Sequence, residues 1–260
     1  MNRRNFILSG LLYFANHSRN QSTENTSEVS SEISKREDLS DIIRRHRQTR
    51  NKKLLEFLGV YPEADYGSFE PVIKYNPGTK VYLDNINSAL KRNSLESRID
   101  PLLMLAIVGV ESDFNTYAIS NKSAGGPFQI MPDTGEDYGL RIHNLGLYRE
   151  ALVAKGKGRN REYESLLRDY IMDLRKNVQN KNQQELKRID QRFAIDTAAD
   201  ASVRIIKDNL DQTRSRDRAI AAYYAGTEVA NRRILPYDVR KYVRNVNRTY
   251  SNLRSRAKGF

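Results

Sequence analysis

The stretch Pro101-Leu-Leu-Met-Leu-Ala-Ile-Val-Gly-Val110 is a nearly uninterrupted apolar run, and it ends directly at Glu111. Asp100 precedes the run, and an aspartate N-cap followed by proline at the first helical position is typical of a helix start. The run therefore predicts a helix that is apolar on every side, and such a helix belongs in the interior of a domain.

Glu111 would lie on the last turn of this helix, where the interior of the domain meets a cleft. Burial there would raise the pKa of its carboxyl and keep it protonated near neutral pH, as a general acid requires. For Glu111 considered alone, a solvated glutamate at a helix end is the simpler interpretation. The residues that follow decide between the two.

An ordered series of short motifs begins at Glu111. In chain order they are Glu111-Ser-Asp-Phe114, Ala118-Ile-Ser120, Ser123-Ala-Gly-Gly-Pro-Phe-Gln-Ile-Met131-Pro132, Thr134-Gly135, Tyr138-Gly-Leu140, Ala222-Tyr-Tyr-Ala-Gly226 and Leu235-Pro-Tyr-Asp-Val-Arg-Lys-Tyr-Val243. The series resembles the lytic transglycosylase (SLT) domain, whose pattern runs E-S-x-F, A-x-S-x-x-G-A-x-G-x-x-Q-x-M-P-x-T and then A-Y-N-A-G. The resemblance covers roughly residues 80–250. Tyr138-Gly-Leu140, Asp190-Gln-Arg-Phe193 and the last motif are most similar to the membrane-bound lytic murein transglycosylase D branch.

The resemblance implies a mainly α fold, with a single lysozyme-like catalytic domain of the goose-type/SLT kind over residues 61–255. Relatives join the motifs on either side of residues 141–192 by a short segment, so this chain carries an insertion there. Helical spacing of apolar residues predicts a basic helix in the insertion, paired with a second helix over 183–189; the apolar residues are Tyr163, Leu166, Leu167, Tyr170, Ile171 and Leu174. The inserted helix is either a decoration packed by its apolar stripe, or a lid or wall-contact element.

The N-terminal 60 residues have a different composition. Residues 1–15 begin with Arg3-Arg4 and continue into a short apolar stretch, which is typical of an export signal or short leader. Residues 16–60 form a polar and then basic linker, with a helical fragment near Leu54-Leu55-Glu-Phe57. We therefore expect an exported protein of the periplasm or cell wall.

The net charge of +12 implies an anionic partner. No nucleic-acid-binding motif accompanies the charge, so anionic wall polymers are the expected partner of the basic surface and nucleic acid is not expected. The chain has no cysteine, which excludes disulfides, thiolate nucleophiles and a lipid-modified cysteine. His17, His46 and His143 are scattered along the chain, so we expect no metal or cofactor, and we expect a monomer.

The resemblance implies that peptidoglycan glycan strands are the substrate and that Glu111 is the catalytic residue. Glu111 would protonate the glycosidic oxygen between N-acetylmuramic acid and N-acetylglucosamine, and then remove the proton of the muramic C6 hydroxyl, which closes onto C1. Most glycosidases use two carboxylates. The nearby candidates, Asp113, Asp133 and Asp137, have no motif of their own, and Asp133 is expected to cap the next helix, so a single-carboxylate mechanism fits better.

The same resemblance assigns five residues to substrate binding. Ser120 would lie near the sugar ring or the Glu111 carboxyl, Gln129 and Met131 would line the saccharide groove, and Tyr223 would place its hydroxyl beside Glu111. Tyr224 stands where the family has asparagine, so a polar contact there is lost or remade. The structural alternatives are a turn residue for Ser120, a core position for Met131 and a buried helix aromatic for Tyr223.

Two other functions remain open from the sequence. A goose-type-like muramidase would have the same fold but use water as the acceptor. A non-catalytic wall-binding or secretion-assembly protein would bind glycan without turnover, and Tyr224 is the feature that favours it.

Overall fold

The structure, a computed structural model, describes residues 69, 72–73, 76, 78–179 and 181–257. The chain divides into two units, residues 1–58 and 59–260, and the described residues all belong to the second. The predicted leader and linker over residues 1–60 lie outside the described residues. None of the helices in the described ranges is long and apolar enough to cross a membrane.

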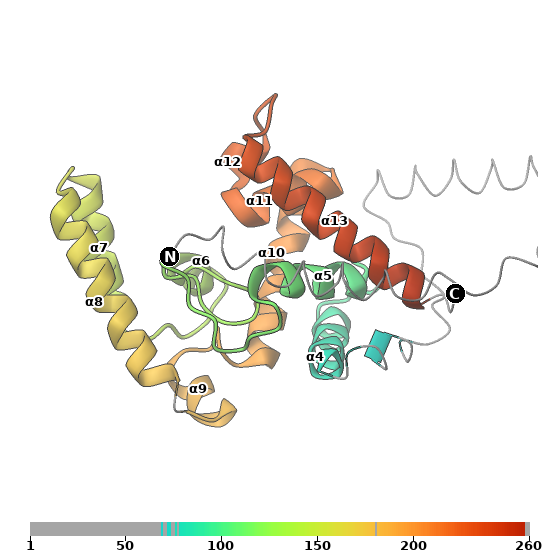
Figure 1. Cartoon of the computed structure of the whole chain (residues 1–260), viewed down its shortest axis with the longest axis horizontal. Coiled ribbons are helices and arrows are strands. Elements are labelled where there is room, and N and C mark those ends of the chain that lie inside the picture. Colours follow the sequence, from blue (N-terminus) through green and yellow to red (C-terminus); the bar gives the residue numbers. More distant parts are fainter. Residues whose placement is uncertain (1–68, 70–71, 74–75, 77, 180, 258–260) are drawn as a thin grey trace, which may run out of the picture. The chain divides into compact units, whose positions relative to one another are not determined.

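The fold of the described ranges is mainly α-helical, which confirms the predicted fold class (Figure 1). Pairing of the β type is limited there to two isolated bridges, Ile119 with Gly125 and Gly125 with Ile130. The helices are α4 (Thr79–Arg92), α5 (Pro101–Ser112), α6 (Pro132–Asp137), α7 (Leu145–Gly156), α8 (Asn160–Val178), α9 (Gln183–Ile189), α10 (Ile195–Thr213), α11 (Arg216–Ala225), α12 (Thr227–Ala230) and α13 (Tyr237–Ala257).

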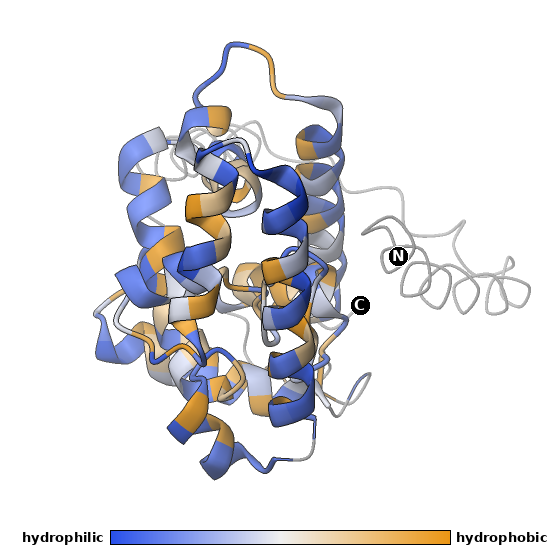
Figure 2. Cartoon of the chain, turned by 90° about the vertical axis from the view of Figure 1, so that its left-hand side faces the viewer, coloured by the Kyte–Doolittle hydropathy of each residue, from blue (hydrophilic) through white to orange (hydrophobic). Residues whose placement is uncertain are grey.

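Helix α5 is the predicted apolar helix, and it begins as expected. The Asp100 side chain accepts a hydrogen bond from the Leu102 amide at 2.9 Å, and its other carboxylate oxygen accepts one from the Tyr250 hydroxyl of α13 at 2.5 Å. Every residue from 102 to 108 is buried, and α5 packs against α4 and α13. Figure 2 shows apolar and polar residues interspersed along the helices.

The C-terminal end of α5 is held by an aromatic side chain of α4. Asp113 and Phe114, with φ of 53° and 61°, both adopt the left-handed conformation that non-glycine residues rarely take. The Tyr82 hydroxyl donates to the Phe114 carbonyl at 2.6 Å, and the two rings lie 5.5 Å apart. These contacts fix the turn that follows Glu111. They therefore fix the position of the Glu111 side chain at the C-terminal end of α5.

Within the segment that the sequence predicts to be an insertion, α7 and α8 form a helical hairpin, which the short helix α9 follows (Figure 1). The helix predicted from the apolar spacing is α8, but α7, which the sequence analysis did not predict, is its partner along its length. The Tyr148 and Tyr170 rings meet across the hairpin at 5.5 Å. The predicted helix over 183–189 is present as α9, and its Leu186 joins the core of the hairpin, but the main partner of α8 is α7. The sequence does not reveal α7 because its apolar residues form no clear helical stripe.

The hairpin shares a second hydrophobic core with the motif residues. Its buried members are Tyr148, Tyr170, Ile171, Leu174, Val178, Leu186 and Phe193, and Ile119 and Met131 pack against them. The apolar stripe of α8 therefore covers the back of the loop that runs from residue 118 to residue 131, which we call the motif loop.

The motif loop folds tightly around two glycines. Gly126 has φ of 76°, and a Cβ atom there would lie 1.8 Å from the Arg192 carbonyl oxygen. A Cβ atom on Gly125 would lie 2.9 Å from the Phe193 ring. The loop thus packs directly against residues 192 and 193, and glycine is required where the backbones meet.

A buried ion pair lies behind the motif loop. Arg192 donates to both carboxylate oxygens of Asp190, at 2.9 Å and 2.7 Å, and neither side chain is exposed. The same guanidinium donates to the Ser123 carbonyl at 2.9 Å and to the Tyr170 hydroxyl at 2.8 Å. One side chain therefore connects the motif loop, α8 and the segment before α10.

Gly126→Ala should destabilise the protein much more than Gly139→Ala. Both glycines have positive φ, so each alanine incurs a left-handed backbone cost of about 1 kcal/mol. Only at position 126 does the added methyl collide with backbone, so we expect a total loss of about 3 kcal/mol or more there. Urea unfolding followed by circular dichroism measures both losses, and equal losses would contradict the described packing.

Candidate active site

Glu111 lies on the last turn of α5 and is partly exposed. Its Oε1 accepts a hydrogen bond from the Tyr242 hydroxyl of α13 at 2.7 Å. A phenol that donates to one oxygen fixes the orientation of a carboxyl group. The carboxyl therefore has a defined orientation rather than that of a free glutamate at a helix end.

Tyr242 is in turn held by Tyr224, at the C-terminal end of α11. The two rings are stacked, with centroids 4.5 Å apart and planes 19° apart. Pairing of aromatic rings contributes about 0.5–1.5 kcal/mol beyond the burial of the rings. Side chains from α5, α13 and α11 thus form a continuous chain of contacts, from Glu111 through Tyr242 to Tyr224.

Tyr223 makes a different set of contacts from those that the sequence predicts. Its hydroxyl donates to the Phe128 carbonyl of the motif loop at 2.9 Å and lies 3.1 Å from the Ser202 hydroxyl of α10. Burial raises the pKa of Tyr223, the negative charge of Glu111 raises it further, and the hydrogen bond with Ser202 opposes both effects. The phenol is thus a neutral donor within electrostatic reach of Glu111, and its hydrogen bonds tie α11 to the motif loop.

Ser120 and Gln129 shape the motif loop. The Ser120 hydroxyl accepts hydrogen bonds from the backbone amides of Lys122 at 3.2 Å and Ala124 at 2.9 Å. The Gln129 side-chain nitrogen donates to the carbonyls of Ala118 at 3.0 Å and Gly126 at 2.9 Å, and Gln129 itself has φ of 50°. Both side chains therefore brace the loop from within.

Met131 is the last residue of the motif loop. It is partly buried, packs against the second core and occupies the N-cap position of α6. The prediction that Asp133 caps this helix was wrong: Asp133 lies in the first turn of α6, where its carboxylate accepts a hydrogen bond from the Thr134 amide at 2.8 Å. Proline at position 132 explains the difference, because proline favours the first helical position and leaves the residue before it as the cap.

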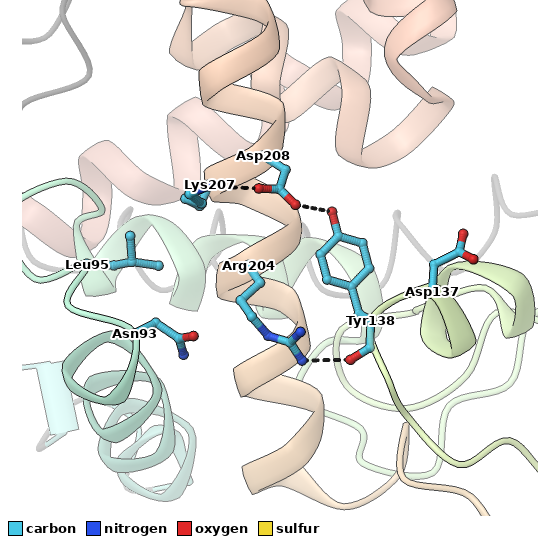
Figure 3. A pocket seen from close by; sticks show the side chains of 7 residues that line it. All are labelled: Asn93, Leu95, Asp137, Tyr138, Arg204, Lys207 and Asp208. Carbon is cyan, nitrogen blue, oxygen red and sulfur yellow. Dashed lines mark hydrogen bonds and ion pairs between the residues drawn. The ribbon is translucent and has the colours of Figure 1, made fainter.

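The other candidate carboxylates lie at helix ends. Asp113 is exposed and is the C-cap residue of α5. Asp137 ends α6 and lines a pocket of about 660 Å³ that Glu111 does not line. Figure 3 shows this pocket between Asn93, Tyr138 and the α10 residues Arg204 and Asp208. Its charges are largely satisfied, since Asp208 accepts from the Tyr138 hydroxyl at 2.8 Å and from Lys207 at 3.1 Å.

Tyr242 is the site residue whose position beside Glu111 the sequence analysis did not predict. Its place in the motif Leu235–Val243 and its inward position on an amphipathic helix were both visible in the sequence. Neither feature shows which buried tyrosine reaches the carboxyl, because that depends on how α13 crosses α5. In the described part of the chain, no three His, Asp or Glu side chains are grouped so as to hold a metal ion.

The part of the chain that contains Glu111 matches a known protein family. Residues 84–152 match the family described as Transglycosylase SLT domain, a span that runs from α4 through Glu111 and the motif loop into α7. No curated protein matches the chain. The region that presents Glu111 is therefore similar to a lysozyme-like family of transglycosylases that act on peptidoglycan.

Proposed function

We propose that this protein is a peptidoglycan lytic transglycosylase that cleaves the β-1,4 bond between N-acetylmuramic acid and N-acetylglucosamine and leaves 1,6-anhydro-muramic ends. The observation that carries the proposal is the Glu111 carboxyl, which lies within the region that matches the SLT family and is oriented by a 2.7 Å hydrogen bond from Tyr242. The last motif supports the D branch of that family. An exported monomer acting in the periplasm or cell wall is consistent with this function.

Glu111 would act first as acid and then as base. Its proton passes to the glycosidic oxygen, the bond from that oxygen to muramic C1 breaks, and the N-acetylglucosamine product leaves with the proton. The carboxylate then takes the proton of the muramic C6 hydroxyl as that oxygen bonds to C1. The residue is protonated again at the end, and no water is consumed. Because Tyr242 holds Oε1, the proton transfers would take place at Oε2.

The remaining site residues would serve the same reaction. Tyr223 would help to position the acid, because its hydroxyl donates to the Phe128 carbonyl and so holds the motif loop against α11 within electrostatic reach of Glu111. Ser120 and Gln129 would keep the motif loop in the shape that binds the glycan, and Met131 would line the groove beside it. Tyr224 would contribute through its stack on Tyr242, in place of the polar contact of the family asparagine.

Glu111→Gln should lower cleavage of purified sacculi by at least about 100-fold, because the amide keeps the shape but cannot cycle a proton. Asp113→Asn is the matched control, since it removes an exposed carboxylate two residues away and should change the rate little. Release of soluble muropeptides measures both. Cleavage by Glu111→Gln at near the wild-type rate would show that another residue is the acid.

The two alternative functions give different products. A hydrolase leaves reducing ends that weigh one water more than anhydro ends, so mass spectrometry of the muropeptides separates the two reactions. A wall-binding protein retains sacculi without releasing soluble product. Reducing ends alone, or binding without turnover by folded protein, would replace the proposed activity with one of these.

We expect Tyr224 to affect kcat through its ring and Tyr242 to affect kcat through its hydroxyl. Tyr242→Phe removes the donor to Glu111 and should lower kcat by about 10- to 100-fold. Tyr224→Ala should lower kcat in the same direction because Tyr242 loses its stack, whereas Tyr224→Phe should stay near wild type. The double variant Tyr224→Ala/Tyr242→Phe should be little worse than Tyr242→Phe alone, because both changes disturb one interaction.

Steady-state kinetics on a soluble glycan separate the possible roles of Tyr224. A role in positioning Tyr242 lowers kcat, whereas direct contact with the glycan raises KM. Fully additive effects in the double variant, or a Tyr224→Phe variant as slow as Tyr224→Ala, would show that the stack does not act through Tyr242.

The basic turn of the hairpin should contribute to wall binding. Lys155, Lys157, Arg159 and Arg161 are exposed at or near the junction of α7 and α8. Replacing all four with serine should weaken sacculus binding at low salt, because attraction to anionic wall polymers is screened over about 10 Å at 0.1 M salt. Turnover of short soluble glycans should be almost unchanged. A collapse of that turnover in the folded variant would instead make the hairpin a lid.

A further inference from the structure

We propose that the outer face of α13, together with the loop before it, docks on an anionic lipid bilayer. This α13 face consists of Ile234, Tyr237, Lys241, Arg244 and Arg248. The proposal does not depend on the catalytic activity, because none of these residues contacts Glu111 in the arrangement described above.

The charged part of the α13 face is a single stripe. Tyr237, Lys241, Arg244 and Arg248 are spaced by four, three and four residues, which places them on one side of a helix, and all four are exposed. The opposite side of α13 is buried in the core. Among the ion pairs of the described residues, none involves Lys241, Arg244 or Arg248, and the exposed carboxylate of Asp238 lies one turn before Lys241.

The apolar part of the α13 face lies at the end of this stripe. Ile234 is 72% exposed and Tyr237 is 66% exposed, more than any other large apolar side chain in the described ranges. The loop between α12 and α13 projects beyond the helices at the top of Figures 1 and 2. Two bulky apolar side chains are thus held in water next to a row of cations.

The projecting loop is pinned at both ends by arginines. Arg218 of α11 donates to the carbonyls of Ala230 and Arg232, each at 2.6 Å. Arg240 of α13 donates to the Leu235 carbonyl at 2.7 Å. The loop therefore has a fixed path that keeps Ile234 outward, and the exposure of its side chain follows from that path.

The combination of cations and apolar side chains favours a bilayer over a soluble polyanion. Cations alone attract wall polymers, nucleic acid and anionic lipid alike. Ile234 and Tyr237 gain nothing from a hydrated polyanion, but they gain free energy when they enter the headgroup and acyl boundary of a membrane. Tyrosine also prefers that boundary. A short apolar tip beside three cations matches a surface that lies on a membrane without crossing it.

Because the chain contains no tryptophan, a single introduced one reports on its own position. Ile234→Trp should show a blue-shifted fluorescence spectrum with phosphatidylcholine vesicles that contain phosphatidylglycerol, and no shift with phosphatidylcholine alone. Met172→Trp on α8 is the matched control, since Met172 is 59% exposed on another helix, and its spectrum should not change. No shift for Ile234→Trp, or equal shifts for both variants, would overturn the proposal.

Vesicle co-sedimentation tests the cations separately. The variant Lys241→Ser/Arg244→Ser/Arg248→Ser should partition onto anionic vesicles roughly 100-fold more weakly at low salt. The variant Lys157→Ser/Arg161→Ser/Arg168→Ser removes the same charge from exposed positions of the hairpin and should bind vesicles nearly as well as wild type. Equal losses in the two variants would mean that only net charge matters and would overturn the assignment to α13.

Replacement of Ile234 and Tyr237 tests whether the α13 face binds a bilayer or a soluble polyanion. Ile234→Ser/Tyr237→Ser should weaken binding to anionic vesicles while leaving binding to soluble heparin unchanged. Vesicle binding that survives this double change would show that the face recognises negative charge alone. If the wild-type protein does not bind vesicles, and the variant Ile234→Ser/Tyr237→Ser no longer cleaves sacculi, then Ile234 and Tyr237 belong to the glycan groove and the proposal is wrong. Circular dichroism and Tm confirm that each variant is folded.

Discussion

The fold around the candidate site depends on the buried pair of Arg192 and Asp190. Burial alone would lower the pKa of the Arg192 guanidinium, but the adjacent Asp190 carboxylate more than offsets that effect and raises it, so the side chain stays charged. A charge without exposed surface is tolerated only when its donors are satisfied. Here they are bonded to Asp190, to the Tyr170 hydroxyl and to two motif-loop carbonyls, those of Ser123 and Ile130.

This requirement explains why the loop has the sequence that it has. Because Arg192 must reach the Ser123 and Ile130 carbonyls, the backbone of the motif loop approaches so closely that no side chain fits at Gly126. Gln129 and Ser120 complete the same geometry from within the loop. Many residues of the motif pattern therefore serve to stabilise the conformation of this loop. Tyr223 of α11 contributes through its hydrogen bond to the Phe128 carbonyl. The hairpin of α7 and α8 also takes part, since Tyr170 of α8 is one of the partners of Arg192.

The sequence predicts the elements that have local signals. Asp100-Pro101 and the apolar run specify α5 and place Glu111 at its end, and the apolar spacing over residues 163–174 specifies α8. It does not predict α7, whose apolar residues form no stripe, or the partner of the Glu111 carboxyl. Tyr223 and Tyr242 are both helix tyrosines that lie in motifs and pack against the core, and only the crossing of α5, α11 and α13 brings Tyr242 to Oε1. The tyrosine at position 224 appears in the sequence as a lost asparagine, whereas in the structure it supplies the stack that holds Tyr242.

The central claim is that Glu111 transfers a proton to and from the sugar while the C6 hydroxyl, and not water, closes onto C1. Digestion of purified sacculi in water enriched in oxygen-18, followed by mass spectrometry of the released muropeptides, tests this claim most directly. New muramic ends should carry no oxygen-18 and should have the mass of the anhydro form. Oxygen-18 in new reducing ends, formed at a rate that depends on Glu111, would show that water is the acceptor and contradict the account.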